Sequence, residues 1–128
     1  MARKKNTTIS ALESERGRIE VSPKVVARIA SDAVLESYGI VGLTNKNVFH
    51  DIADLLTGDN ASKGVEVAME PEGAVLDLYV VVQYGTRISE VVNGVISRLR
   101  YTLEEKMGIP VSSINLHIQG LQFDEDKK

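Results

Sequence analysis

The segment of residues 65–84 constrains the fold most, because its apolar side chains recur at every second position on both sides of a turn. This alternation occupies residues 65–69 and returns in residues 76–84. Pro71 and Gly73 between them suit the second and fourth positions of a type I turn. A period of two is typical of strands with one buried face, so this segment predicts a β-hairpin.

A long amphipathic helix is predicted after the hairpin. Apolar residues recur every three or four positions from Ile88 to Met107, which indicates one buried helix face. Thr86 is placed to cap the start of this helix, and Gly108 is placed to end it. Gly94 is expected to mark a close approach to another element, because glycine in a helix interior costs roughly 1 kcal/mol relative to alanine.

A final strand is predicted from the alternation that begins at Ile114. Gly120 is expected to form a β-bulge, because the apolar series resumes after it on the opposite parity at Leu121. A strand, a helix and a strand in succession predict two parallel strands joined by a right-handed crossover.

The first half of the chain predicts a strand–helix–strand unit and a less regular segment. Ser22 suits the cap of the helix, and Gly39 suits its end. The predicted elements of this half are a strand at 18–21, a helix at 23–38, a strand at 40–43, a short amphipathic helix at 47–57 and a loop at 59–63.

The predicted fold class is α+β, a two-layer sandwich. Each of the two main helices has a single apolar stripe, so both are expected to pack on one face of a mixed β-sheet. The order of elements is β-α-β-(α)-β-β-α-β. One domain is expected over residues 17–123, between a flexible tail at 1–16 and a charged tail at 124–128.

Composition excludes several classes of chemistry. The 128 residues include no Cys and two His, which excludes disulfides, thiolate metal sites, iron–sulfur clusters and a Cys nucleophile. The net charge of -3 argues against a general nucleic-acid binder. We expect a cytoplasmic protein, because neither a secretory signal nor a membrane-spanning apolar run is present.

The residue patterns predict no catalytic, cofactor or metal site. Glycine fingerprints of nucleotide-binding loops do not occur. His50 and His117 lie far apart in the sequence. His50 is more simply explained as a solvated polar side chain, and His117 as a half-exposed sheet or interface residue. Glu104 and Glu105 diverge by about 100° on a helix, so they cannot act on one atom. We therefore expect a protein that is not an enzyme and holds no cofactor.

The face of the predicted sheet without helices is the strongest candidate for a binding surface. Tyr79 and Val81 would expose apolar area there unless something covers them. Self-association or docking of a partner protein would cover them. Alternatively, the 47–57 segment or residues 121–123 would fold back over this face. The candidate interaction surface comprises Tyr79, Val81, Gln83, His117 and Gln119.

Five segments share their order and spacing with one known family. They are GRIEVSP at 17–23, GIVGL at 39–43, KGVEV at 63–67, DLYVVVQYG at 77–85 and the run from Met107 to Leu121. Together they resemble the alkaline shock protein family, also called the Gls-type general stress family, over about residues 17–123. Residues 84–89 are similar to its small housekeeping branch.

The resemblance implies a non-catalytic protein-interaction or scaffold module linked to cell-envelope homeostasis and the stress response. It also implies self-assembly and a protein partner, such as a membrane-anchored one that holds the chain near the inner membrane surface. No catalytic residues are carried over. Two alternatives stay open: an RNA-associated module and an accessory to an acyl- or lipid-metabolising enzyme. Salt-dependent affinity for RNA would favour the first, and a retained lipid would favour the second.

Overall fold

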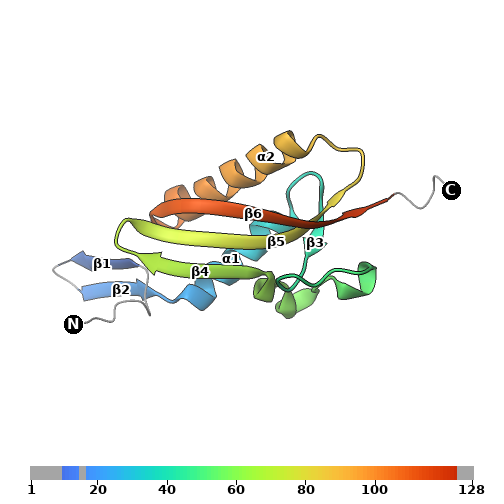
Figure 1. The fold of residues 1–128 in the computed structure, drawn as a ribbon. Coiled ribbons are helices and arrows are strands. Elements are labelled where there is room, and N and C mark those ends of the chain that lie inside the picture. Colours follow the sequence, from blue (N-terminus) through green and yellow to red (C-terminus); the bar gives the residue numbers. More distant parts are fainter. Residues whose placement is uncertain (1–9, 15–16, 124–128) are drawn as a thin grey trace.

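The computed structural model describes residues 10–14 and 17–123, which form a two-layer α+β sandwich and a separate hairpin (Figure 1). The central strand of the sheet is β5 (Gly73–Gln83). β6 (Val111–Gln122) runs parallel to β5 along one edge. The two strands that flank the long helix are therefore parallel, as predicted.

The other edge of β5 is shared by two strands. β4 (Val65–Glu70) pairs antiparallel with residues 73–78 of β5, which confirms the predicted hairpin. β3 (Ile40–Leu43) pairs antiparallel with residues 80–82. The sheet is therefore mixed, with β6 alone on one side of β5 and with β4 and β3 end to end on the other.

The two main helices cover one face of this sheet (Figure 1). α1 (Pro23–Leu35) begins after Ser22, whose hydroxyl accepts a hydrogen bond from the N–H of Val25 at 3.3 Å. α2 (Ile88–Arg100) continues into a π-helical segment, Tyr101–Lys106. The segment 88–107, predicted to be one helix, is thus helical over almost its whole length.

The core lies between the helices and the sheet and is aliphatic. Leu76, Leu78, Val80 and Val82 occupy every second position of β5 and are fully buried. Burying such a side chain contributes roughly 1.5–3 kcal/mol relative to leaving it exposed. The helices bury matching stripes at a spacing of four: Val26, Ala30 and Val34 of α1, and Val91, Val95 and Leu99 of α2.

The N-terminal hairpin stands apart from this sandwich. β1 (Ser10–Ser14) pairs antiparallel with β2 (Gly17–Val21), and neither strand joins the main sheet. The predicted strand at 18–21 forms, but the predicted tail 1–16 contains β1. The remainder of that tail and the predicted tail 124–128 lie outside the described residues.

The prediction of a short α-helix at 47–57 is wrong. This segment is irregular apart from a 3₁₀ turn, Ile52–Asp54, and the predicted loop at 59–63 lies within a second 3₁₀ helix, Gly58–Gly64. The physical reason is that the carboxylates of Asp51 and Asp54 accept hydrogen bonds from nearby backbone N–H groups. Such local bonds compete with those of an α-helix.

Two predictions about α2 are also wrong. Thr86 does not cap it, because its hydroxyl donates to the carbonyl of Gln83 at 2.8 Å and Arg87 occupies the cap position. Gly94 marks no close approach, since a Cβ added there would meet no atom within 4 Å. The close approach lies instead at Gly39, where an added Cβ would clash with Val91 of α2.

Candidate functional site

The helix-free face of the sheet has a covered half and an open half. Val81 lies in the covered half and is fully buried. It is paired on both sides with glycines, Gly42 of β3 and Gly120 of β6. A Cβ added to Gly42 would lie 3.1 Å from the Leu55 side chain, and one added to Gly120 would clash with the Phe49 ring. The irregular segment 44–57 therefore packs over Val81.

Val81 is expected to be exposed unless something covers it, and in the structure it is covered. Of the two alternatives left open by the sequence, the fold-back of the 47–57 segment is the one observed at this residue. Glycine on each neighbouring strand leaves room for Phe49 and Leu55 to approach the sheet.

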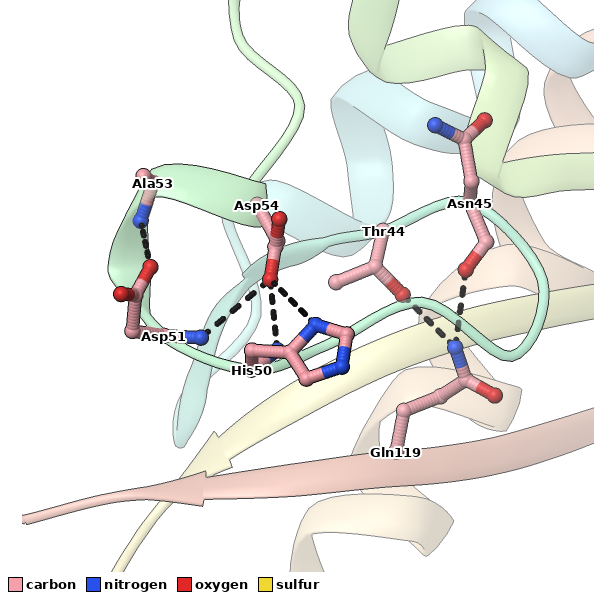
Figure 2. Close-up of polar contacts among 7 residues, drawn as sticks. All are labelled: Thr44, Asn45, His50, Asp51, Ala53, Asp54 and Gln119. Atoms are coloured by element: carbon pink, nitrogen blue, oxygen red, sulfur yellow. Dashed lines mark hydrogen bonds and ion pairs between the residues drawn. The ribbon is translucent and has the colours of Figure 1, made fainter.

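Gln119 fastens this covering segment to the edge of the sheet (Figure 2). Its side-chain amide donates to the hydroxyl of Thr44 at 2.9 Å and to the carbonyl of Asn45 at 2.8 Å. Its carbonyl oxygen accepts from the N–H of Asn47 at 3.0 Å. These bonds satisfy both ends of one amide and occupy Gln119 within the chain.

The predicted β-bulge explains why Gln119 is available for this role. Val80 opposes Ile118 and Val81 opposes Gly120, so Gln119 is the extra residue in β6. A bulge redirects the side chain at the irregularity and bends the strand. The bulge predicted at Gly120 is confirmed, and its consequence is an anchor for residues 44–47.

A second set of polar contacts shapes the covering segment (Figure 2). The Asp54 carboxylate accepts from the N–H of His50 at 2.5 Å and from the N–H of Asp51 at 3.2 Å. The His50 ring lies 3.5 Å from the same oxygen. The two backbone hydrogen bonds hold the pKa of Asp54 below its ordinary value of 3.8.

The open half of the helix-free face carries a connected group of polar side chains from three strands. The His117 ring stacks on the Tyr79 ring with centroids 4.7 Å apart. His117 Nε2 lies 2.9 Å from Asp77 Oδ1, and the Asn115 amide donates to the same oxygen at 3.2 Å. The Tyr79 hydroxyl donates to Glu66 at 3.1 Å. We call these five residues the polar platform.

In the platform the His117 imidazole is exposed to solvent, whereas the Tyr79 phenol is buried. Tyr79 is 5% exposed, whereas the His117 side chain is 45% exposed. Burial, and next the hydrogen bond to Glu66, raises the pKa of the Tyr79 hydroxyl above 10.0. Tyr79 therefore stays neutral near neutral pH and acts as a donor that holds β4 against β5.

The helix-free face is acidic. Its strand residues include three carboxylates, Glu66 and Glu70 of β4 and Asp77 of β5. No Lys or Arg shares this face on β4, β5 or β6. The imidazole of His117 is the one basic group among the five platform residues, and it is already engaged by Asp77.

Two clefts of the described chain lie away from the platform. One, of about 240 Å³, opens between α1 and the end of α2 beside the 2.7 Å ion pair of Glu36 and Arg98. Another, of about 300 Å³, lies between the start of α1 and β4. Neither is lined by a platform residue. Among the described residues no three His, Asp or Glu side chains are placed to hold a metal ion.

The five residues predicted for the interaction surface thus have different environments. His117 is exposed at the platform, and Tyr79 lies buried beneath it. Val81 is covered, Gln119 anchors the covering segment, and Gln83 is half-buried near the end of β5.

Sequence reasoning missed the other three platform residues, Glu66, Asp77 and Asn115. Asp77 and Asn115 each alternate with apolar neighbours, which places them on the helix-free face. What brings them together is the register of the parallel pair, in which Asp77 opposes Asn115 and Tyr79 opposes His117.

The fold and this face define a small α+β sandwich domain with an acidic, hydrogen-bonded sheet surface. The chain belongs to the alkaline shock protein family, whose model matches residues 11–123 and whose description is a cell envelope-related function. This match confirms the resemblance found in the sequence. The family's description names a cellular context and no reaction.

Similar proteins come from two bacteria. The uncharacterized protein YloU of Bacillus subtilis is 38% identical over 112 residues, which cover 87% of this chain and 93% of YloU. The uncharacterized protein Spy1614 of Streptococcus pyogenes is 31% identical over the same shares of the two chains. The uncharacterized protein YqhY of Bacillus subtilis is 31% identical over 88% of this chain and 82% of YqhY.

No solved structure matches the chain. No helix in the described part of the chain is both long and apolar enough to cross a membrane.

Proposed function

We propose that the chain is a non-catalytic protein-interaction module and that its polar platform binds a basic segment of a partner protein in the cell envelope. In this proposal the chain is cytoplasmic and reaches the inner membrane surface only through that partner. The acidic character of the helix-free face carries the proposal, together with the family's cell envelope-related description.

The geometry of the platform supports a binding role. Its side chains are held by hydrogen bonds across three strands, so little conformational freedom is lost when a partner binds. Asp77 and His117 keep part of their side chains exposed, at 31% and 45%. A Lys or Arg of the partner would find carboxylate acceptors already in place.

The alternatives from the sequence find less support on this face. An RNA-binding sheet attracts phosphate with Lys and Arg, whereas the platform carries Glu66 and Asp77. The raised pKa of Tyr79 opposes a role as a base. No platform residue lines either of the two clefts described above, so neither cleft offers an acyl chain a site at the platform.

The test is affinity capture from native cells with the wild-type chain and the double variant Glu66→Gln/Asp77→Asn. Each exposed ion pair is worth up to about 1 kcal/mol, so we expect about a threefold loss of affinity per carboxylate. Higher salt should also weaken capture by the wild type, because it screens the same charge pairs that the double variant removes. The matched control is Glu105→Gln, an exposed carboxylate on the π-helical segment.

A captured protein that crosslinks through a basic segment to the platform, and is lost in the double variant alone, supports the proposal. Equal capture by the wild type and the double variant overturns it. So does a partner that crosslinks only to the helix layer, or one that disappears after ribonuclease treatment.

A further inference from the structure

Beyond Val111, the outer edge of β6 is a long strand edge that no other strand of the described chain occupies. At Val111 the backbone carbonyl accepts from Arg100 and the backbone N–H donates to Glu104, each at 3.2 Å. β6 has 12 residues, and among the described residues β5 is the only strand that pairs with it. An open edge offers backbone donors and acceptors in a row, ready to pair with another strand. The backbone edge of β6 is a different surface from the platform, although β6 supplies the platform residues Asn115 and His117. Pairing at this edge does not depend on the proposed function.

The composition of β6 differs from that of an edge strand protected against pairing. Residues 111–122 contain no charged residue and no proline. Natural edge strands are commonly guarded by Lys, other charges, proline or shortness. On the opposite side of the sheet, β4 carries Glu66 and Glu70 within six residues, and β3 has only four residues.

The irregularities of β6 leave one regular stretch between them. The register shifts after Val111, where Ser112 is the extra residue, and again at Gln119. Residues 113–118 pair with β5 without interruption. Any strand added to the outer edge would therefore find its regular template at 113–118.

Apolar side chains on this stretch are only partly covered by the helix layer. Ile118 is 36% exposed, and Ile114 and Leu116 are half-buried. Val92 and Ile96 of α2 are also half-buried and lie on the same helix stripe as Arg100. Arg100 donates to the carbonyl of Val111 at 3.2 Å, which places that stripe on the β6 side of the helix.

We propose that a second copy of this chain pairs with β6 in antiparallel orientation, about a two-fold axis at Leu116, and joins the two sheets into one. In this arrangement Leu116 opposes itself, and Ile114 opposes Ile118 of the second copy. Directly opposite residues of an antiparallel pair lie on one face, so these side chains extend the apolar layer across the axis.

The pattern of β6 selects this register. Around Leu116 the sequence is apolar at 114, 116 and 118 and uncharged polar at 113, 115, 117 and 119. An axis at Asn115 would oppose Ile118 with Ser112, and an axis at His117 would oppose Ile114 with Gly120. Only the axis at Leu116 matches all three apolar side chains with one another.

Charge also favours a copy of the same strand. Self-pairing places no like charges opposite each other, because residues 111–122 contain no Asp, Glu, Lys or Arg and carry no charge while His117 is neutral. On the helix-free face, Asn115 would oppose His117 of the second copy. The two polar platforms would then adjoin across the axis.

The first test is the solution mass of the full chain by light scattering or sedimentation. We expect twice the 14.0 kDa of one copy. Ile118→Lys puts a charge against Ile114 of the other copy and should weaken self-association about tenfold or more. The matched control is Val25→Lys, at an exposed apolar residue of α1, which should leave the mass unchanged.

The second test fixes the register, using the natural absence of cysteine. Opposite residues bring their Cβ atoms to about 5 Å, whereas diagonal ones lie at about 7–8 Å. Leu116→Cys should therefore oxidise to a disulfide-linked dimer, and Asn115→Cys should not. This readout also serves if Ile118→Lys fails to fold.

A monomeric wild type overturns the inference, as does a dimer that Ile118→Lys leaves intact. A disulfide that forms through Asn115→Cys and not through Leu116→Cys also overturns the proposed register. The capture experiment for the platform has a separate readout, so either proposal can fail while the other stands.

Discussion

Single residues decide how the helix-free face is divided. Gly120 leaves room for the Phe49 ring, and Gly42 leaves room for Leu55. Gln119 supplies both ends of its amide to the segment that these side chains hold down. The division into a covered half and an open platform therefore depends on two glycines and one glutamine that lie outside the platform itself.

Gly120→Ala should destabilise the fold, because its Cβ would clash with the Phe49 ring. Forcing an extra methyl group into a packed site costs typically about 1–3 kcal/mol. Gly94→Ala is the matched control, since its Cβ would meet open space on an exposed helix position. That control should be neutral or stabilising by up to about 1 kcal/mol. Denaturant unfolding of both variants measures the difference, and equal midpoints would contradict the packing described.

Asp54 should titrate below its ordinary value in the folded chain. Hydrogen bonds from His50 and Asp51 favour its charged form, so the pKa measured by NMR should lie below 3.8. With a depressed folded-state pKa, its contribution to stability is present above pH 3.8 and is lost as pH falls through the folded value. Asp54→Asn should remove this pH dependence. A folded-state pKa at or above 3.8 would refute the hydrogen bonds described for the Asp54 carboxylate.

Among the elements, the irregular segment 44–57 has the role of covering one half of the helix-free face. Residues 44–57 have one 3₁₀ turn, yet they cover Val81 and are tied to β6 by three hydrogen bonds. Thr44 is fully buried, so its hydroxyl depends on a partner from within the chain. Backbone bonds hold its two ends, from the Thr44 N–H to the Tyr79 carbonyl and from the Leu56 N–H to the Leu43 carbonyl, each at 2.8 Å. Side chains hold the stretch between these ends.

Gln119→Ala should loosen this segment more than the rest of the sheet. It removes the side chain that bonds the Thr44 hydroxyl and the Asn47 N–H, at a cost of about 1–3 kcal/mol. Hydrogen exchange should accelerate over residues 44–57 while β5 stays protected. Gln122→Ala is the control, because the Gln122 side chain bonds its neighbour Phe123, at 3.4 Å, and not the covering segment. Unchanged exchange in Gln119→Ala would argue against the anchor.

Elements with a long, uninterrupted periodicity can be predicted from the sequence, whereas the short helical spacing of apolar residues at 47–57 predicts an α-helix that does not form. The alternation of 65–84 and the helical stripe that begins at Ile88 are local patterns, and both elements form. In the 44–57 segment, apolar residues at helical spacing pack onto the sheet instead, while Asp51 and Asp54 bond the backbone. Side-chain competition of this kind leaves no periodic signal.

The candidate site is even less accessible to sequence reasoning. His117 can be found because it alternates with apolar residues on a predicted strand. Asp77 and Asn115 join it only through the parallel register of β5 and β6, which no local pattern fixes. The sequence leaves the covering of Val81 open between a partner and a fold-back, because the segment that covers Val81 lies far earlier in the chain and is irregular.

At the scale of the whole molecule, the sandwich presents two surfaces with different physical character. The helix-free face offers fixed carboxylates and an exposed imidazole, which suits a basic protein segment. The outer edge of β6 offers uncharged backbone and half-covered apolar side chains, which suits a second copy of the same strand. Together they would give a symmetric module with two adjoining platforms.

Site-specific photo-crosslinking in native cells tests whether the helix-free face binds the partner. The probe replaces Ala68, which is exposed on that face of β4 beside Glu66. A matched probe replaces Glu105, exposed on the π-helical segment. We predict a protein adduct from position 68 that is lost in Glu66→Gln/Asp77→Asn, and no adduct from position 105. An adduct that forms only from position 105 would contradict it.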